Sequence, residues 1–476
     1  MNDELPEGWA VASTADLFTF VTSGSRGWAQ YYAESGALFL RIANLDHDNI
    51  AIDLTEKKYV QPPPSAEGTR TRVKIGDLLV SITADVGMIG LVQRDLGEAY
   101  INQHIALARP AKGIDREYLA WYLTSREGQV QLRDLQRGAT KVGLGLDDIR
   151  AIRLPLAPIE EQHRIVHKVE ELFAKVDGCR ARLATLPGIL TRFRQAVLAA
   201  ACEGRLTQDL TGSNWAAKNE VLLDEVASEI RTGPFGSALH RTDYIVGGIP
   251  VINPMNLVSG RVVPSPQVTV SESTFKRLEN YALQEGDVIL ARRGEMGRCA
   301  LIGSKEAGWL CGTGCAILRL GPEARPAFIE LVISSPATRT FLREASVGTT
   351  MDNLNQKAFR SIPIFLPGTT EQDEVVCRVR ALYRFADQIE ARYEKARAHV
   401  DKLTQSILAR AFRGELVMTE AALARREGRS YETAEQLLAR IQNERAQPAN
   451  GLARRVGPLN RVRRKKTFDR SGKRRS

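Results

Sequence analysis

The clearest pattern along the chain is a stripe of apolar residues that occurs twice. Apolar residues recur at alternating steps of four and three positions along residues 165–197, and again along residues 375–407. Charged residues fill many of the positions between them. These steps place the apolar residues on one side of an α-helix, and about five consecutive heptads are typical of a coiled coil. The pattern therefore predicts two long coiled-coil helices.

A proline lies inside the first of these predicted helices. Pro187 directly follows Leu186, which belongs to the apolar stripe. Proline lacks the backbone N–H donor and its ring clashes with the preceding helical turn. We therefore expect the first helix to break or kink after Leu186, although the apolar pattern continues in register beyond it.

Short motifs outside the stripes show that the chain is an internal repeat. The run Gly-Asp-Leu-Leu-Val at 76–80 recurs as Gly-Asp-Val-Ile-Leu at 286–290, and the Glu-Gln pair at 161–162 recurs at 371–372. Both pairs are 210 residues apart, as are the two apolar stripes. A repeat of this length is far longer than one unit of a solenoid, so it indicates two diverged copies of a whole domain-and-helix unit.

The part of each copy that precedes its helix has a different texture. Short apolar runs, such as 75–80 and 288–290, alternate with Gly, Pro, Asn and Asp, which is typical of an α+β domain with many loops. The predicted order is a globular domain at 1–157, a helical region at 158–211, a globular domain at 212–367, a helical region at 368–420, a short terminal helix within 421–446 and a basic tail at 447–476.

Composition and charge narrow the class of protein. With 43% hydrophobic and 26% charged residues, the chain has the composition of a folded globular protein. No run approaches the roughly 20 apolar residues of a membrane span, and residues 1–7 lack the pattern of a signal peptide, so we expect a cytoplasmic protein. The net charge of +10 comes entirely from residues 447–476, which hold eleven Lys or Arg and one Asp. This tail either binds nucleic acid non-specifically or only aids solubility.

No catalytic, cofactor or metal site is predicted. The run Asp-Leu-Thr-Glu-Lys-Lys at 53–58 resembles part of a metal-dependent nuclease site but has no upstream acidic partner. Cys311-Gly-Thr-Gly-Cys315 and Cys299 lack a fourth zinc ligand, so a buried strand pair is the better interpretation. His163 and His167 are four residues apart on a predicted helix but lack a third ligand, which favours a solvated helix face.

Basic and amide-bearing loops of the globular domains are the remaining candidates for function. Arginine forks suit phosphates and the edges of guanine bases, so these loops are candidates for DNA contact, with ordinary solvated loops as the alternative. The candidates are Ser25, Arg26, Arg41, Arg70, Arg72, Lys74 and Lys141 in the first domain, and His240, Arg241, Arg292, Arg293 and Arg298 in the second.

Taken in order, the motifs resemble those of the specificity subunit of type I restriction-modification systems, over residues 4–446. The motifs that carry this resemblance are Leu5-Pro-Glu-Gly-Trp9, the two Gly-Asp runs, the helix entries at 155–162 and 367–372, and the segments 412–416 and 434–442. Gly233-Pro-Phe-Gly-Ser237 and residues 248–252 resemble one subclass of recognition domain. Pro187 and the basic tail depart from the family pattern.

The resemblance implies a fold and a set of partners. It implies an α+β protein in which two target recognition domains alternate with two helices packed as an antiparallel coiled coil, related by a pseudo-twofold axis. It further implies binding of double-stranded DNA at a bipartite asymmetric target, two modification (methyltransferase) subunits and restriction subunits, in a bacterial or archaeal cell. S-adenosylmethionine, ATP and Mg would be bound by those partners. The alternatives are a non-catalytic coiled-coil adaptor and a nuclease with duplicated recognition domains.

Overall fold

The computed structural model describes residues 5–24, 27–62, 70–136, 143–211, 220–235, 238–258, 260–346 and 354–446. The chain divides into two compact units, one formed by Met1–Gly178 with Val400–Ser476 and the other by Cys179–His399. Each unit contains one globular domain, together with part of each long helix. Three of the candidates for DNA contact lie outside the described residues, namely Ser25, Arg26 and Lys141. The tail at 447–476 lies outside them too.

The globular domain of the first unit is built on two four-stranded sheets. In the first sheet all neighbours are antiparallel, in the order β2 (Phe18–Ser23), β9 (Ile105–Pro110), β6 (Leu78–Ser81) and β7 (Ile89–Leu91). The second has the order β3 (Tyr32–Ala33), β5 (Tyr59–Val60), β4 (Ala37–Leu40) and β8 (Ala99–Ile101), with β4 and β8 parallel. A separate pair joins β1 (Ala10–Ser13) to β10 (Arg153–Leu156).

The second domain repeats both sheets and adds a short pair, β15 (Leu257–Val258) with β16 (Arg261–Val262). Its first sheet has the order β12 (Ala227–Thr232), β21 (Cys315–Leu320), β18 (Val288–Ala291) and β19 (Cys299–Leu301). Its second has the order β13 (Tyr244–Ile245), β17 (Thr269–Val270), β14 (Ile249–Ile252) and β20 (Leu310–Cys311), again with one parallel pair, β14 with β20. β11 (Glu220–Leu222) pairs with β22 (Pro363–Phe365). The internal repeat predicted from the sequence is confirmed.

Helices follow the sheets in the same order in both domains. The first domain has α3 (Arg116–Thr124), α4 (Arg126–Asp134) and α5 (Leu146–Arg150), and the second has α10 (Pro326–Ser334), α11 (Pro336–Ser346) and α12 (Gln356–Arg360). Helix α10 begins 210 residues after α3. Strand β18, which follows the second Gly-Asp motif, likewise begins 210 residues after β6. Both domains are therefore α+β, as expected.

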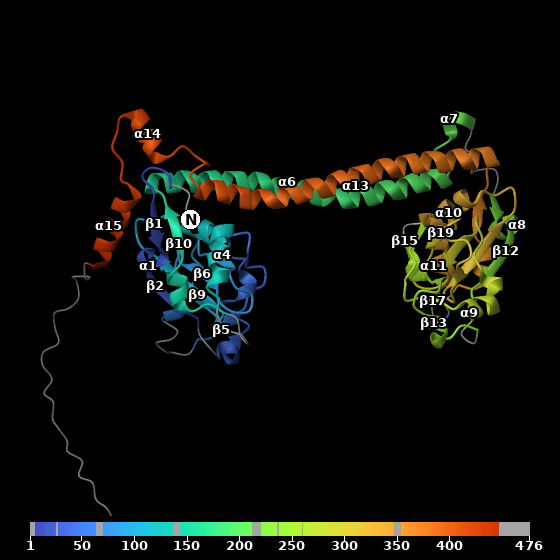
Figure 1. Cartoon of the computed structure of the whole chain (residues 1–476), viewed down its shortest axis with the longest axis horizontal. Helices are drawn as coiled ribbons and strands as arrows, with labels where there is room; N and C mark the ends of the chain where they lie inside the picture. Colours follow the sequence, from blue (N-terminus) through green and yellow to red (C-terminus); the bar gives the residue numbers. More distant parts are fainter. Residues whose placement is uncertain are drawn as a thin grey trace, which may run out of the picture. The chain divides into compact units, whose positions relative to one another are not determined.

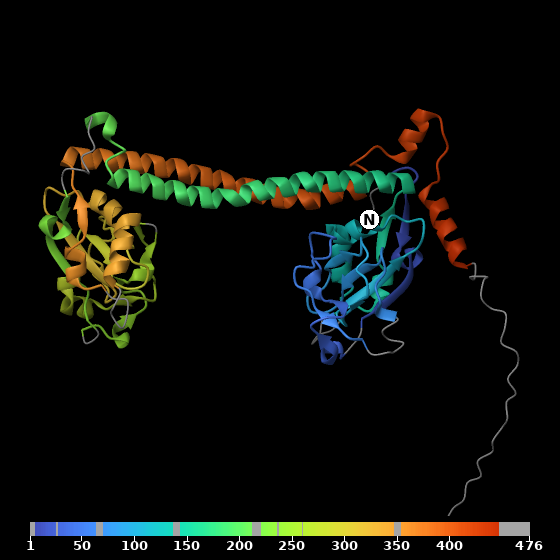
Figure 2. The same cartoon turned by 180° about the vertical axis from the view of Figure 1, so that it is seen from behind.

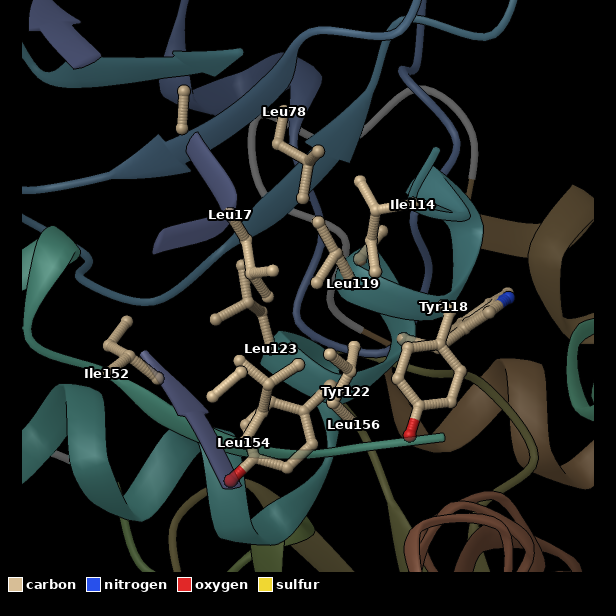
Figure 3. Close-up of a cluster of buried hydrophobic side chains, with 14 of the residues drawn as sticks. Leu17, Leu78, Ile114, Tyr118, Leu119, Tyr122, Leu123, Ile152, Leu154 and Leu156 are labelled. Carbon is tan, nitrogen blue, oxygen red and sulfur yellow. The ribbon is translucent and has the colours of Figure 1, made fainter. Parts of the chain in front are cut away.

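The core of the first unit joins its domain to the long helices. Tyr118 and Tyr122 of α3 are fully buried among leucines, and Figure 3 shows them beside Leu154 and Leu156 of β10. Each phenol O–H donates to a backbone carbonyl of β10, at 2.7 Å. Both rings also lie edge-on to Phe412, with centroids 5.2 and 5.1 Å apart. Burial of these tyrosines is favourable because their polar atoms have partners.

The two long helices, α6 (Ile159–Cys202) and α13 (Thr369–Phe412), pack side by side within each unit (Figures 1 and 2). In the first unit the start of α6, including Ile165, shares a core with the end of α13, including Leu408. In the second unit the end of α6, including Val197, shares a core with the start of α13, including Val379. Start meets end in both units, so the helices are antiparallel.

Of the two outcomes expected at Pro187, a break does not occur. Helix α6 is continuous from Ile159 to Cys202. Pro187 is exposed, and its missing N–H leaves the carbonyl of Leu183, one turn earlier, without its helical donor. The hydroxyl of Thr191 donates to the Pro187 carbonyl at 2.9 Å, and Leu190 on the next turn is buried. Packing on the far side of the proline thus maintains the helix.

The segment 421–446 differs from the single terminal helix expected there. It contains most of α14 (Glu420–Glu427) and all of α15 (Ala434–Ala446). Leu437 and Ile441 of α15 are buried in the core of the first unit. The guanidinium of Arg445 donates to the Ala15 carbonyl at 2.8 Å. No helix within the described ranges is long and apolar enough to cross a membrane.

Candidate nucleic-acid interface

The repeated Gly-Asp motif supports the strands that carry the loops. Asp77 is buried before β6, where it accepts a hydrogen bond from the backbone N–H of Lys74 and two from Arg109 of β9, at 2.6 and 2.7 Å. In the second domain Asp287 pairs with Arg319 in the same way, at 3.1 Å. Burial raises the pKa of Asp287, while Arg319 opposes that shift. The motif therefore fixes one end of the sheet.

Four loops, from both sheets of the second domain, meet at the end of β18 that is opposite Asp287. We call them the second loop end: residues 233–235 after β12, 253–255 after β14, 292–293 after β18 and 312–314 between β20 and β21. Gly233 N donates to the Cys315 carbonyl at 2.9 Å, and Gly312 N donates to the Ile252 carbonyl at 2.8 Å. A Cβ atom on Gly233 would lie 2.0 Å from the Gly312 carbonyl oxygen, so only glycine permits this close approach.

Arg292 does not project from the second loop end as its sequence position suggested. It is only 4% exposed, and its Nε donates to the Leu354 carbonyl at 2.9 Å. Its guanidinium carbon lies 5.5 Å from the centre of the Phe235 ring. Burial lowers the pKa of the guanidinium, and the nearby charge of Arg293 adds to this effect. The expectation of a freely accessible Arg292 is wrong, because the loops fold over it.

The other basic candidates of the second domain differ in their exposure to solvent and in their ion pairing. Arg293 is exposed beside Arg292. Arg298, at the far side of the β18–β19 turn, is held by Glu295 at 2.7 Å, which offsets its charge. His240 and Arg241 are both exposed, and the backbone N–H of His240 donates to a carboxylate oxygen of Asp243 at 2.7 Å. Arg293 is thus the exposed candidate at the second loop end.

The first domain has an equivalent loop end, formed by the segments after β2, β4 and β6 and the connection between β8 and β9. Gly24 N donates to the Ile105 carbonyl at 3.0 Å, and Thr83 Oγ1 lies 2.6 Å from His104 Nδ1. Asn102 N donates to the Leu40 carbonyl, which places Arg41 beside this connection. Arg41 Nε is buried and has no hydrogen-bond partner among the described residues. The structure therefore brings Arg41 to the first loop end.

The remaining candidates of the first domain lie elsewhere on it. Arg70, Arg72 and Lys74 are exposed. Arg72 forms a backbone bridge with Tyr100 of β8, and Lys74 lies four residues before β6, at the end of that strand opposite the loop end. The DNA-contact candidates of the first domain therefore do not lie together on one surface.

Three exposed residues of the loop ends were not singled out from the sequence. Phe235 is 58% exposed although it is a large apolar residue, and Met255 after β14 is 71% exposed. In the first domain, the exposed amide of Gln103 lies 3.1 Å from His104. The exposure of Phe235 could have been predicted from its place inside a Gly-Pro-Phe-Gly turn, because such turns lie on the surface.

The Glu-Gln pair at the start of each long helix attaches the helix to its surroundings. Gln162 accepts from Asp115 N at 3.1 Å and donates to the Ala157 carbonyl at 2.7 Å. Gln372 accepts from Arg325 N and donates to the Pro367 carbonyl, at 2.7 and 2.8 Å. We call this pair of contacts the glutamine clamp.

The glutamate that precedes each clamp holds the segment that follows the other long helix. Glu161 accepts from Glu420 N at 2.7 Å, and Glu371 accepts from the Thr207 hydroxyl at 2.8 Å. Burial raises the pKa of Glu161, and the hydrogen bond from Glu420 N opposes that rise. The same motif thus performs the same attachment in both units.

The cysteines and histidines weighed as metal ligands are placed as follows. Cys311 and Cys315 are fully buried in adjoining strands, and burial raises the pKa of both thiols. His163 lies 3.8 Å from a carboxylate oxygen of Asp115. In the part of the chain that the structure describes, no three His, Cys, Asp or Glu side chains are arranged to hold a metal ion.

Comparison with known proteins agrees with the duplicated architecture. The model of the type I restriction modification DNA specificity domain matches twice, at residues 48–186 and 219–396. The chain is 28% identical over 431 residues to the type I restriction enzyme EcoKI specificity subunit of Escherichia coli K12, covering 87% of this chain and 90% of that protein. The StySPI specificity subunit of Salmonella potsdam is also 28% identical, over 433 residues, with the same coverage.

A solved structure shares the fold. The HsdS subunit from Thermoanaerobacter tengcongensis superposes with a TM-score of 0.60 at 21% identity, over 87% of this chain and 99% of that one. The two matches fall on the two copies of the repeat. The first covers the first domain from residue 48 and the beginning of α6, and the second covers the second domain from residue 219 and the beginning of α13. The chain therefore belongs to the family of type I restriction-modification DNA specificity subunits.

Proposed function

We propose that this chain reads a bipartite, asymmetric DNA target, with one half-site for each globular domain. The observation that carries this proposal is that the two domains have the same sheets but different residues at their loop ends. The position of the buried Arg292 in the second domain is occupied by Ile82 in the first, and Asn253 stands where the first has Arg41. Equivalent scaffolds with different polar groups are suited to reading different bases in the two halves of a duplex.

The chain would act as a reader and a scaffold for catalytic partners. The long helices begin with the same Glu-Gln attachment in both units, which supports two similar docking surfaces and hence two modification subunits. Restriction subunits would join this complex. S-adenosylmethionine, ATP and Mg would then be bound by the partners, and the complex would act in the cytoplasm, where the DNA lies.

Single-molecule methylation sequencing tests this proposal. DNA is compared from cells that express this chain with its modification subunit and from cells that express the modification subunit alone. We expect a new methylated motif with two defined half-sites and an unread spacer, only when this chain is present. A complex that assembles but methylates no motif would instead support a coiled-coil adaptor. Cleavage of DNA by the purified chain with Mg, without partners, would support a nuclease.

The spacer offers a second test, of the role of the helices. We propose that α6 and α13 together set the distance between the two half-sites. Seven residues, or one heptad, are deleted from each helix so that the apolar seam stays in register. We expect both half-sites to persist and the spacer to change, or methylation to be lost. Methylation of the original motif with its original spacer would refute this role.

A further inference from the structure

The buried guanidinium of Arg292 has a donor without an acceptor. Its Nε donates to the Leu354 carbonyl, but Nη1 is buried and has no hydrogen-bond partner among the described residues. A buried charged donor without a partner is strongly unfavourable compared with a paired one. The site thus holds a hydrogen bond that is available to a ligand that arrives with an acceptor.

Phe235 covers this guanidinium and faces solvent itself. The ring lies 5.5 Å from Arg292 Cζ, within cation–π distance, and the residue is 58% exposed. Phe235 follows the close approach of Gly233 to Gly312, so its backbone is held against the neighbouring loop. An exposed aromatic ring can turn about its side-chain bonds without unfolding the core, and such a turn would uncover Arg292.

The first domain shows that the fold does not need an arginine at this position. Ile82 occupies the equivalent place, 210 residues earlier, and is 6% exposed. Its backbone N donates to the His104 carbonyl and its carbonyl accepts from Leu144 N, both at 2.9 Å. Arg292 makes the matching backbone contacts, with the Gly314 carbonyl and with Leu354 N, at 2.8 and 3.0 Å. The backbone ties are therefore common to both domains, and the guanidinium is an addition specific to the second.

We propose that Phe235 and Arg292 form a gated base-reading pair, in which the ring moves aside on DNA binding and Arg292 donates to an acceptor on a base edge. This inference rests on the proposed function and assigns one specificity-determining contact within it. Guanine, with its O6 and N7 acceptors in the major groove, is the base that a guanidinium suits best. The pair would therefore set one position of the half-site read by the second domain.

Two variants of the complete complex test the proposal by methylation sequencing. Arg292→Ile copies the first domain, so the loop end should still fold, and Phe235→Leu replaces the ring that lies over Arg292 but keeps the arginine. Lys305→Gln serves as the control, because it removes one positive charge from an exposed residue in the turn that follows β19, at the other end of the sheet. Thermal unfolding of each purified variant checks that the second domain is intact.

We expect one half-site to be unchanged in both variants. One position of the other half-site should become degenerate in Arg292→Ile, whereas Phe235→Leu keeps the arginine and should keep that position defined. Preference for the correct base at that position should fall by about 5- to 150-fold, the effect of one base-edge contact. Lys305→Gln should give the original motif. The original motif from folded Arg292→Ile would overturn the inference, as would a lower methylated fraction of this variant with every position still defined. Loss of the same position in folded Phe235→Leu would also overturn it, because the ring and not Arg292 would then read the base. A wild-type complex that methylates no bipartite motif would refute the proposed function and this inference with it.

Discussion

Glu330 of α10 should make the stability of the second domain depend on pH. The residue at the equivalent position in the first domain is Ala120, which is fully buried. A Cβ atom on Gly260 would lie 2.9 Å from Glu330 Oε1, so the carboxylate packs closely against the chain. Burial raises its pKa from 4.5 to about 7, and the positive charge of Arg380 offsets part of this rise.

The sign and size of the effect follow from this pKa. Because the folded-state pKa lies above the unfolded one, the stability linked to Glu330 is fully present below about pH 4.5. It is lost as the pH rises through about 7. The difference between 4.5 and about 7, at roughly 1.4 kcal/mol per pKa unit, corresponds to about 3 kcal/mol. Glu330→Gln stays neutral at every pH and should therefore stabilise the second domain at pH 8 but not at pH 4.5.

Differential scanning calorimetry of the full chain at several pH values measures this effect. At about 2–4 °C per kcal/mol for a domain of this size, Glu330→Gln should raise the melting temperature of the second domain by about 6–12 °C at pH 8. Hydrogen exchange of the α10 amides assigns the transition to this domain. Glu272→Gln, an exposed residue of α9 (Glu272–Arg277), is the matched control. An equal difference between Glu330→Gln and wild type at pH 5 and pH 8 would refute the reasoning.

Three further changes test contacts within a single unit. Asp77→Ala leaves Arg109 without its buried partner, at a cost of about 3–5 kcal/mol, so calorimetry should show the first domain melting at least about 6 °C lower. Phe412→Ala removes the ring packed against two buried tyrosines and should lower the unfolding free energy by about 3–5 kcal/mol in urea titrations, while an unchanged midpoint would contradict that packing. Arg298→Gln breaks a partly exposed ion pair, so thermal unfolding should change by less than about 1 kcal/mol, and a larger loss would show a role in the core.

The long helices and the repeat could be predicted because their signals are periodic and local. The apolar stripes at 165–197 and 375–407 fall inside α6 and α13, and the offset of 210 also holds between α3 and α10 and between β6 and β18. The separation of α14 from α15 also had local signals that the sequence interpretation missed. Thr419 caps the start of α14, and Gly428 ends it with a φ of 64°.

The loop ends could not be predicted to the same degree, because burial there depends on contacts distant in sequence. Arg292 follows an apolar strand, as an exposed arginine at a strand end would. Its burial comes from Phe235 and Leu354, which lie 57 and 62 residues away along the chain. Exposure of Phe235 likewise depends on the packing of Gly233 against a separate loop. No periodic pattern in one sequence encodes such pairings.

The glutamine clamp has a consequence for how such proteins diversify. Gln162 and Gln372 hold their domains through backbone N–H and carbonyl groups, at positions occupied by different residues in the two copies. Backbone partners are present whatever side chains a domain carries. A recognition domain exchanged by recombination at these helix entries would bring the partners of the clamp with it. Target specificity can thus change in one genetic step without a new attachment having to evolve.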